Sequence, residues 1–276
     1  MEQIEKIEGD FAFRTGLSGG VLVKSATVGL WMALEALNLA PGSRVALSAI
    51  VCPQVLAALQ LARLHPVFID TSWLDFGIDP VALESTQNLS AIIAVHAFGM
   101  SCRIELLAQI AQSKGIPIIE DACLGYGVEG ITLGKHARAV IVSFGTDKLV
   151  SAGGSGMILS NNRSLLDRFR EIRSQNPMLF ERSPKVLSVI EKALPTLHKR
   201  AETRKIRSLR YKNELTVPLT VPTAVPLWRF PLVLHQERTG FLQDAKAKGL
   251  FISTHYHPLN HFQTGSTLPI TDEVCK

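Results

Sequence analysis

The spacing of apolar positions changes repeatedly between Val21 and Leu159. Short apolar runs of strand length alternate with longer stretches in which apolar residues return every three or four positions, as in a helix with one buried face. We predict strands over residues 44–49, 66–69, 91–95, 116–119, 139–142 and 157–159, and helices over residues 26–39, 54–64 and 105–113. Apolar strands separated by helices indicate βαβ units, so we expect an α/β fold with a mainly parallel sheet covered on both faces.

The pattern changes after Asn161 and Asn162. We predict a charged helix over residues 163–173, a long helical stretch over 184–211 interrupted at Pro195, and then a strand over 228–234 and a helix over 236–249. This order of elements predicts a large α/β domain over residues 1–175 and a small α+β domain over residues 176–276.

Composition supports a folded chain. Apolar residues make up 46% of the 276 residues and charged residues 19%, which allows a sizeable core and excludes wholesale disorder. The first residues are acidic and polar, and no apolar run reaches the length of a membrane span, so we expect a cytoplasmic protein. The four cysteines lack the CxxC spacing of many metal sites, and we expect reduced thiols and no metal.

Much of the positive charge is local. The net charge is +5, and residues 198–212 alone contain seven Lys or Arg against one acid. Such a segment can bind nucleic acid or another anionic surface, but it is more often a solvated helix face or the source of an arginine for a phosphorylated ligand. Tyr211 is the only aromatic residue among these charges, which argues against nucleic acid.

Polar residues follow several of the predicted strands directly. Asp70, His96, Glu120-Asp121 and Ser143 each come at the end of an apolar run, and Lys148 lies five residues after Ser143. Ligands of open parallel sheets bind beyond the carboxyl ends of the strands. These residues therefore predict a site at one edge of the sheet.

Lys148 is the most informative of them. It lies on a short connection after a strand and before the glycine-rich residues 151–156, where a ring could approach the backbone closely. A lone lysine on a loop is usually a solvated surface residue, but this placement also suits a lysine that bonds to an aldehyde.

Two further signals favour pyridoxal phosphate as the ligand. Ser25-Ala26-Thr27 opens the first long helix; it can be an ordinary helix cap, or it can bind a phosphate at the helix amino end. Asp121 can cap a turn, or it can keep a pyridine nitrogen protonated so that the ring withdraws electrons. Neither signal is specific alone, but lysine, aspartate and phosphate site form an ordered set.

These motifs resemble those of the DegT-type nucleotide-sugar aminotransferases, which are fold-type I pyridoxal-phosphate enzymes with a seven-stranded large domain. The matching segments look like the family motifs S-G-T-A-A-L, P-V-F-V-D, H-x-F/Y-G, E-D-A, S-F-x-x-x-K and Y-x-P-L-H, and they are residues 25–30, 66–70, 96–99, 120–122, 143–148 and 255–259. The resemblance extends from about Ile4 to the last residue.

The resemblance implies a role for each of several residues. Lys148 would be catalytic and bond to the cofactor, Asp121 would pair with its ring nitrogen, and the phosphate would bind to Ala26, Thr27 and Ser143. The other positions that it implies are cofactor contacts at Cys52 and Leu124 and substrate contacts at His96, Tyr256 and His257. It also implies a homodimer that moves an amino group from glutamate to a nucleotide-linked keto-sugar, in polysaccharide or natural-product biosynthesis.

The chain departs from the family pattern in several places. Leu124 stands where the family has a glutamine that hydrogen-bonds to the cofactor, and the G-x-N-x-R stretch of the partner subunit has no clear counterpart after Arg173. Relative to the family, we expect a chain shortened at both ends with an incomplete small domain. These departures leave an alternative: a cofactor-binding homologue with a regulatory or dimerisation role and no transaminase activity.

Overall fold

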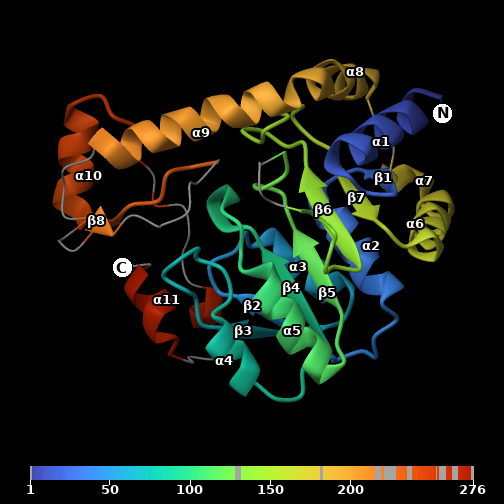
Figure 1. Cartoon of the computed structure of the whole chain (residues 1–276), viewed down its shortest axis with the longest axis horizontal. Coiled ribbons are helices and arrows are strands. Elements are labelled where there is room, and N and C mark those ends of the chain that lie inside the picture. Colours follow the sequence, from blue (N-terminus) through green and yellow to red (C-terminus); the bar gives the residue numbers. More distant parts are fainter. Residues whose placement is uncertain are drawn as a thin grey trace.

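The computed structural model describes residues 2–127, 132–180, 183–214, 219–220, 228–234, 238–252, 254, 259–262 and 267–274. A seven-stranded sheet lies at its centre, between helices on both faces (Figure 1). The strands are β1 (Gly19–Val23), β2 (Arg44–Ser48), β3 (His65–Ile69), β4 (Ala91–Val95), β5 (Ile118–Asp121), β6 (Ala139–Ser143) and β7 (Gly156–Ser160). The predicted fold class, an α/β fold with a helix-covered sheet, is confirmed.

The strands lie in the order β1-β7-β6-β5-β4-β2-β3. Strand β2 pairs in parallel with β3 and β4, and β4-β5 and β5-β6 are also parallel pairs. Strand β7 is antiparallel to both β6 and β1. The carboxyl ends of the five strands from β2 to β6 therefore meet at one edge of the sheet, where antiparallel β7 begins.

The amino end of the chain contains two elements that the apolar pattern did not predict. Helix α1 (Glu2–Thr15) precedes β1, whose first two residues are Gly19 and Gly20. Glycine is depleted in strands, which weakens the sequence signal there. The strand predicted over residues 116–119 lies instead at Ile118–Asp121. Pro117 has no N–H to donate to a ladder, so the strand starts after it.

Three helices cover one face of the sheet: α2 (Ala26–Ala36), α3 (Gln54–Leu61) and α6 (Arg163–Gln175). Leu34, Leu59 and Phe169 of these helices are almost completely buried and share a core with Val45 and Ile93 of the sheet. Alternate strand residues point to this face, as the pleat requires.

The opposite face is covered in two halves. Helices α1 and α8 (Pro184–Ala193) lie over β1, β7 and β6, while α4 (Pro80–Ser85) and α5 (Ile104–Lys114) lie over the other strands. The first half contains an aromatic cluster in which the Phe11 ring lies 5.4 Å from Phe144 and 5.7 Å from Tyr126, between centroids. Ile190 and Leu197 belong to the same core. Residues just beyond 175 thus pack on the large domain, and the two-domain division stays a prediction.

The chain then leaves the sheet through a long helix. A 3-10 turn, η2 (Leu194–Thr196), joins α8 to α9 (Leu197–Glu214), so the predicted interruption at Pro195 is confirmed. Helix α9 (orange in Figure 1) runs along one side of the molecule towards α10 (Arg238–Ala247) and the short pair β8 (Leu219–Thr220) and β9 (Val233–Leu234). The remaining short helices are η1 (Ala97–Gly99), α7 (Pro177–Phe180), η3 (Leu259–Phe262) and α11 (Pro269–Val274). No helix in the described ranges is long and apolar enough to cross a membrane.

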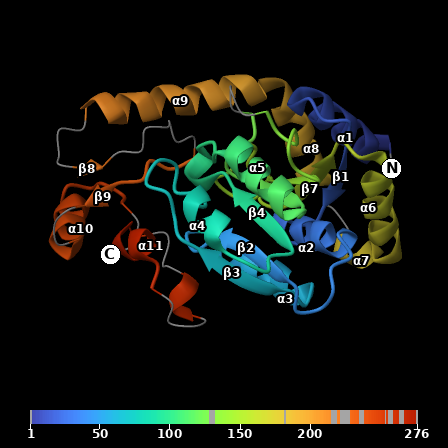
Figure 2. The same ribbon diagram turned by 60° about the horizontal axis from the view of Figure 1, so that its bottom comes forward.

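Helix α11 returns to the carboxyl end of β3 (Figure 2). The Asp70 carboxylate, directly after β3, accepts hydrogen bonds from the backbone N–H groups of Ile270 at 3.1 Å and Thr271 at 2.9 Å. A carboxylate at the amino end of a helix satisfies N–H groups that have no partner within the helix. Asp70 thus anchors α11 on the large domain.

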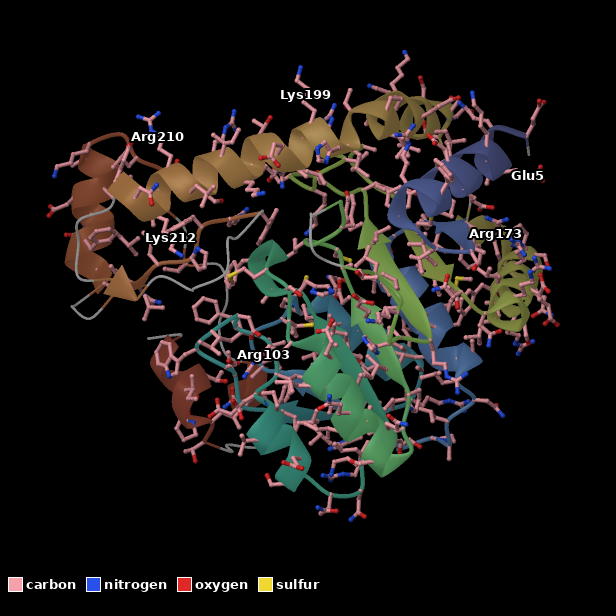
Figure 3. The ribbon with its side chains drawn as sticks, in the orientation of Figure 1. Glu5, Arg103, Arg173, Lys199, Arg210 and Lys212 are labelled. Carbon is pink, nitrogen blue, oxygen red and sulfur yellow. The ribbon has the colours of Figure 1, made fainter. Side chains whose placement is uncertain are left out.

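An ion pair closes the exposed edge of the sheet at β1. The Glu8 Oε1 atom of α1 accepts the backbone N–H of Leu22 at 2.7 Å and pairs with Arg173 of α6, which also donates to the Leu22 carbonyl at 3.2 Å. Figure 3 labels Arg173 and, on α1, Glu5. The two side chains occupy the backbone groups that an additional strand would otherwise bind.

We expect Glu8→Ala to lower the free energy of unfolding by about 3 kcal/mol, since it breaks a largely buried pair and leaves Arg173 uncompensated. Glu8→Gln keeps an acceptor for Leu22 and should lose less. Urea denaturation measures both, with Glu5→Ala as the control because Glu5 is exposed on the same helix. Equal midpoints for Glu8→Ala and Glu5→Ala would contradict this role.

Candidate active site

Two polar side chains end neighbouring strands. Asp121 is the last residue of β5 and Ser143 the last residue of β6, and they are 9% and 8% exposed. In the sheet register Asp121 lies opposite Ile141, while Ser143 lies opposite Gly156 of β7. Two of the predicted site residues therefore lie on adjacent strands at the same sheet edge.

The amino end of α2 reaches this same edge. Ser25 caps the helix by accepting the backbone N–H of Val28 at 3.2 Å, so the cap interpretation of Ser25 holds. The N–H groups of Ala26 and Thr27 are in the first turn, where a helix offers them no acceptor. They form the part of the helix that can bind an anion.

Gly156 brings the helix end and the strand end together. A Cβ atom at this position would lie only 2.7 Å from the Ala26 nitrogen and 2.8 Å from the Val142 carbonyl oxygen. Because Gly156 is also the register partner of Ser143, the first turn of α2 lies close to Ser143. The Ser143 Oγ accepts the Gly145 N–H at 3.2 Å and can still donate its own proton. The predicted phosphate-binding groups thus converge.

Cys123 lies beside Asp121 in the turn after β5. Burial raises the pKa of the Cys123 thiol well above its usual range, and the Asp121 carboxylate raises it further. Asp121 is fixed beside Cys123, because its Oδ1 accepts the Cys123 N–H at 3.0 Å.

Lys148 lies on the connection between β6 and β7 and is half-buried. Its backbone N–H donates to Gly145 at 3.3 Å. Its Nζ lies 4.7 Å from the ring centroid of Trp228, which makes a cation–π contact. The amine is therefore placed against an aromatic ring rather than extended into solvent.

The other two predicted cofactor contacts, Cys52 and Leu124, also border this edge. Cys52 is exposed and directly precedes Pro53 at the start of α3. Leu124 is half-buried and follows Cys123 in the turn after Asp121. Its side chain is apolar and offers no hydrogen bond to a bound ring.

His96, predicted to contact substrate, is enclosed within the protein. It is completely buried, its Nε2 lies 2.7 Å from Glu120 Oε1, and its Nδ1 accepts the Cys102 N–H at 3.2 Å. Since Nδ1 accepts, Nε2 carries the proton that is donated to Glu120. The other Glu120 oxygen accepts the Gly134 N–H at 2.8 Å. Both ring nitrogens are thus used within the protein, and this geometry argues against a direct substrate contact.

Tyr256 and His257, predicted to contact substrate, lie outside the described residues. Three residues near the site were not predicted: Cys123, Tyr126 and Trp228. The Tyr126 hydroxyl donates to the Ser143 carbonyl at 2.8 Å and accepts the Val150 N–H at 3.0 Å, which joins the turn after Asp121 to the lysine connection. The position of Cys123, two residues after Asp121, could have indicated that it lies near the site. No local pattern indicates Trp228, which is 80 residues from Lys148 in sequence.

Comparison with known proteins places this chain in a family of aminotransferases. The model of the DegT/DnrJ/EryC1/StrS aminotransferase family matches residues 2–182. A pleiotropic regulatory protein of Geobacillus stearothermophilus is 31% identical over 177 residues, which cover 62% of this chain and 48% of that protein. The GDP-perosamine synthase of Escherichia coli O157:H7 is 27% identical over 177 residues, with the same two coverages.

The fold also matches a solved structure. A DegT DnrJ EryC1 StrS aminotransferase from Brucella abortus superposes with a TM-score of 0.90 at 21% identity, covering 100% of this chain and 83% of that one. At this identity the likeness shows the fold. The chain spans about half the length of the curated relatives it matches.

We expect Gly156→Ala to weaken the binding of pyridoxal phosphate. The added methyl group would push the amino end of α2 away from the strand edge, since both of its close neighbours are backbone atoms. Loss of a charge-assisted hydrogen bond costs about 1.5–3 kcal/mol, or roughly 10- to 100-fold in affinity. Equilibrium titration with pyridoxal phosphate measures the affinity of each variant. Gly154→Ala is the control, because a Cβ there meets nothing within 4 Å. Equal affinities in the two variants would contradict a phosphate site at the amino end of α2.

We also expect iodoacetamide at pH 8 to modify Cys52 and to spare Cys123. Alkylation requires the thiolate, and the raised pKa of Cys123 keeps its thiol protonated at this pH, whereas Cys52 is exposed. Peptide mass mapping before and after unfolding in urea measures the difference, and both thiols should react once the chain is unfolded. Equal rates in the native protein would be inconsistent with the described surroundings of Cys123.

Proposed function

Since the chain belongs to the DegT/DnrJ/EryC1/StrS aminotransferase family, we propose that it is a pyridoxal-phosphate-dependent aminotransferase acting on a nucleotide-linked keto-sugar. The observation that carries this proposal is the convergence at one sheet edge. Asp121 and Ser143 end adjacent strands, Ser143 lies beside the first turn of α2, and Lys148 lies on the connection that follows Ser143.

The residues present suit each part of the cofactor. The N–H groups of Ala26 and Thr27 and the Ser143 hydroxyl are hydrogen-bond donors at a helix amino end, which favours a phosphate. Gly156 leaves room beside them that a side chain would fill. Asp121 is a buried carboxylate with a fixed orientation, suited to a protonated ring nitrogen.

When bound, the cofactor supplies an aldehyde that bonds to amines and a ring that withdraws electrons from that bond. Lys148 contributes the amine at which the group is attached and, once released, a base that moves a proton at the amino-acid carbon. Asp121 holds a proton on the ring nitrogen. Burial of both Asp121 and Ser143 at the edge excludes water from one side of the site.

Substrate and assembly follow from the family and its relatives. One relative is named as a synthase of GDP-perosamine, a nucleotide-linked amino sugar, which supports a nucleotide-sugar acceptor used in polysaccharide or natural-product biosynthesis. Glutamate is the amino donor in this proposal. The homodimer that the family resemblance implies is also part of this proposal.

A second function has specific support. Leu124 cannot supply the hydrogen bond that a glutamine makes to the cofactor, and one relative is named as a pleiotropic regulatory protein. These two observations favour a homologue that binds the cofactor and regulates or dimerises without transaminating. The two functions share the cofactor site and differ only in their response to an amino donor.

We expect purified protein with pyridoxal phosphate to show an absorbance band near the edge of the visible range that Lys148→Ala abolishes. Glutamate should remove this band in the wild type if the protein is an aminotransferase. Loss of a proton-transferring group typically costs 10²- to 10⁴-fold in rate. The rate of amino transfer by Lys148→Ala should therefore be lower than that of the wild type by about that factor or more.

Lys135→Ala is the matched control, because Lys135 is exposed. A band that persists in Lys148→Ala would refute the proposed attachment site. A band that depends on Lys148 but is unaffected by glutamate would favour the regulatory homologue.

A further inference from the structure

The backbone that carries Lys148 adopts an uncommon conformation. Asp147, the preceding residue, has a φ of 65°, in the left-handed region that non-glycine residues rarely occupy. The hydrogen bonds within the turn are long: 3.3 Å from the Lys148 N–H to the Gly145 carbonyl, and 3.3 Å from the Asp147 N–H to Ser151 Oγ. A turn of this kind persists where surrounding groups hold it.

Donors from distant parts of the chain hold this turn. The Arg204 Nη2 atom of α9 donates to the carbonyl oxygens of Asp147 and Lys148, both at 3.0 Å. The indole Nε1 of Trp228 donates to the same Asp147 carbonyl at 3.2 Å. The carbonyl of the strained residue thus receives two side-chain hydrogen bonds, one of them from a charged donor, which is the stronger kind.

Arg204 differs from most of the basic residues around it. Lys199, Arg210 and Lys212 of the same helix are exposed (labelled in Figure 3), whereas Arg204 is half-buried and directed at the lysine turn. Within the basic segment of residues 198–212, Arg204 thus contacts backbone carbonyls beside the proposed catalytic amine.

Trp228 contacts the lysine in a second way. Its backbone N–H donates to the Phe98 carbonyl at 2.9 Å, and its ring lies under the Lys148 Nζ at 4.7 Å. The Arg229 guanidinium lies 4.4 Å from the same ring. The indole is fixed by its backbone and by Nε1, so it limits the directions in which the amine can point.

We propose that Arg204 and Trp228 are positioning residues for Lys148, which keep its turn and its amine in the geometry needed for bonding to an aldehyde. The reactive part of this inference rests on the proposed function, whereas the hold on the turn does not. The reactivity of Lys148 would then depend on two distant parts of the chain, helix α9 and the segment that contains Trp228.

The test uses the whole 276-residue chain and five variants. Arg204→Met removes both donated bonds and Arg204→Lys keeps a charged donor; Trp228→Phe keeps a ring but loses the Nε1 donor. Lys199→Met and Trp31→Phe are the matched controls, the first exposed on the same helix and the second a half-buried tryptophan of α2 that packs against a different core cluster. Two readouts are compared: hydrogen–deuterium exchange of residues 144–152 without cofactor, and the rate at which pyridoxal phosphate becomes attached to Lys148, trapped by borohydride and located by peptide mapping.

We expect Arg204→Met and Trp228→Phe to exchange faster in this segment than the wild type and to load Lys148 about 10-fold more slowly, since misplacement of about 1 Å can cost up to 10²-fold. Arg204→Lys should restore part of the loading rate, and the controls should match the wild type. Wild-type exchange in both variants would overturn the inference. Faster exchange with an unchanged loading rate would also overturn it, because the contacts would then be structural only.

The two proposals fail in different ways. If the wild type does not attach pyridoxal phosphate to Lys148 at all, the proposed function is wrong, and exchange alone then decides whether Arg204 and Trp228 hold the turn. If Arg204→Met does not fold, Trp228→Phe and Arg204→Lys still give both readouts.

Discussion

The close approach of α2 to the first residue of β7 is the constraint on which the site depends. A Cβ at position 156 would lie 2.7 Å from the Ala26 nitrogen, so only glycine lets the helix end reach the strand edge. That approach puts the first-turn N–H groups of α2 beside Ser143, and the parallel strands put Asp121 on the neighbouring strand. A single steric requirement therefore joins the anion-binding end of a helix to the polar end of a sheet.

The site also depends on which groups are kept from water. Asp121 and Ser143 are almost completely buried, and Asp121 is oriented by a backbone N–H. In such surroundings charges interact more strongly than in bulk water, and burial together with the Asp121 carboxylate raises the pKa of the Cys123 thiol. A buried carboxylate of fixed direction is suited to holding a proton on a ligand.

The lysine belongs to a different part of the architecture. Asp121 and Ser143 are held by the sheet, but Lys148 lies on a connection whose carbonyls are bonded by Arg204 and Trp228. Tyr126 ties the other end of this connection to Ser143 and Val150. The amine is thus the least locally determined group in the site. Its geometry is set by long-range contacts, whereas the groups predicted to bind the phosphate are positioned by neighbouring strands and one helix.

Sequence alone determined six of the seven strands of the sheet, most of the helices and the residues at the strand ends. Apolar runs alternating with helical periodicity are local signals, and a polar residue directly after such a run, as at Asp121 and Ser143, marks the ligand-binding edge whatever the rest of the chain does. Local signals missed β1, where Gly19 and Gly20 weaken the strand pattern. Only the tertiary structure decided that His96 is bonded to Glu120 within the core, that Gly156 abuts Ala26, and that Arg204 and Trp228 reach Lys148. These are contacts between residues far apart in the chain, and their formation depends on how helices and strands pack, which no local spacing encodes.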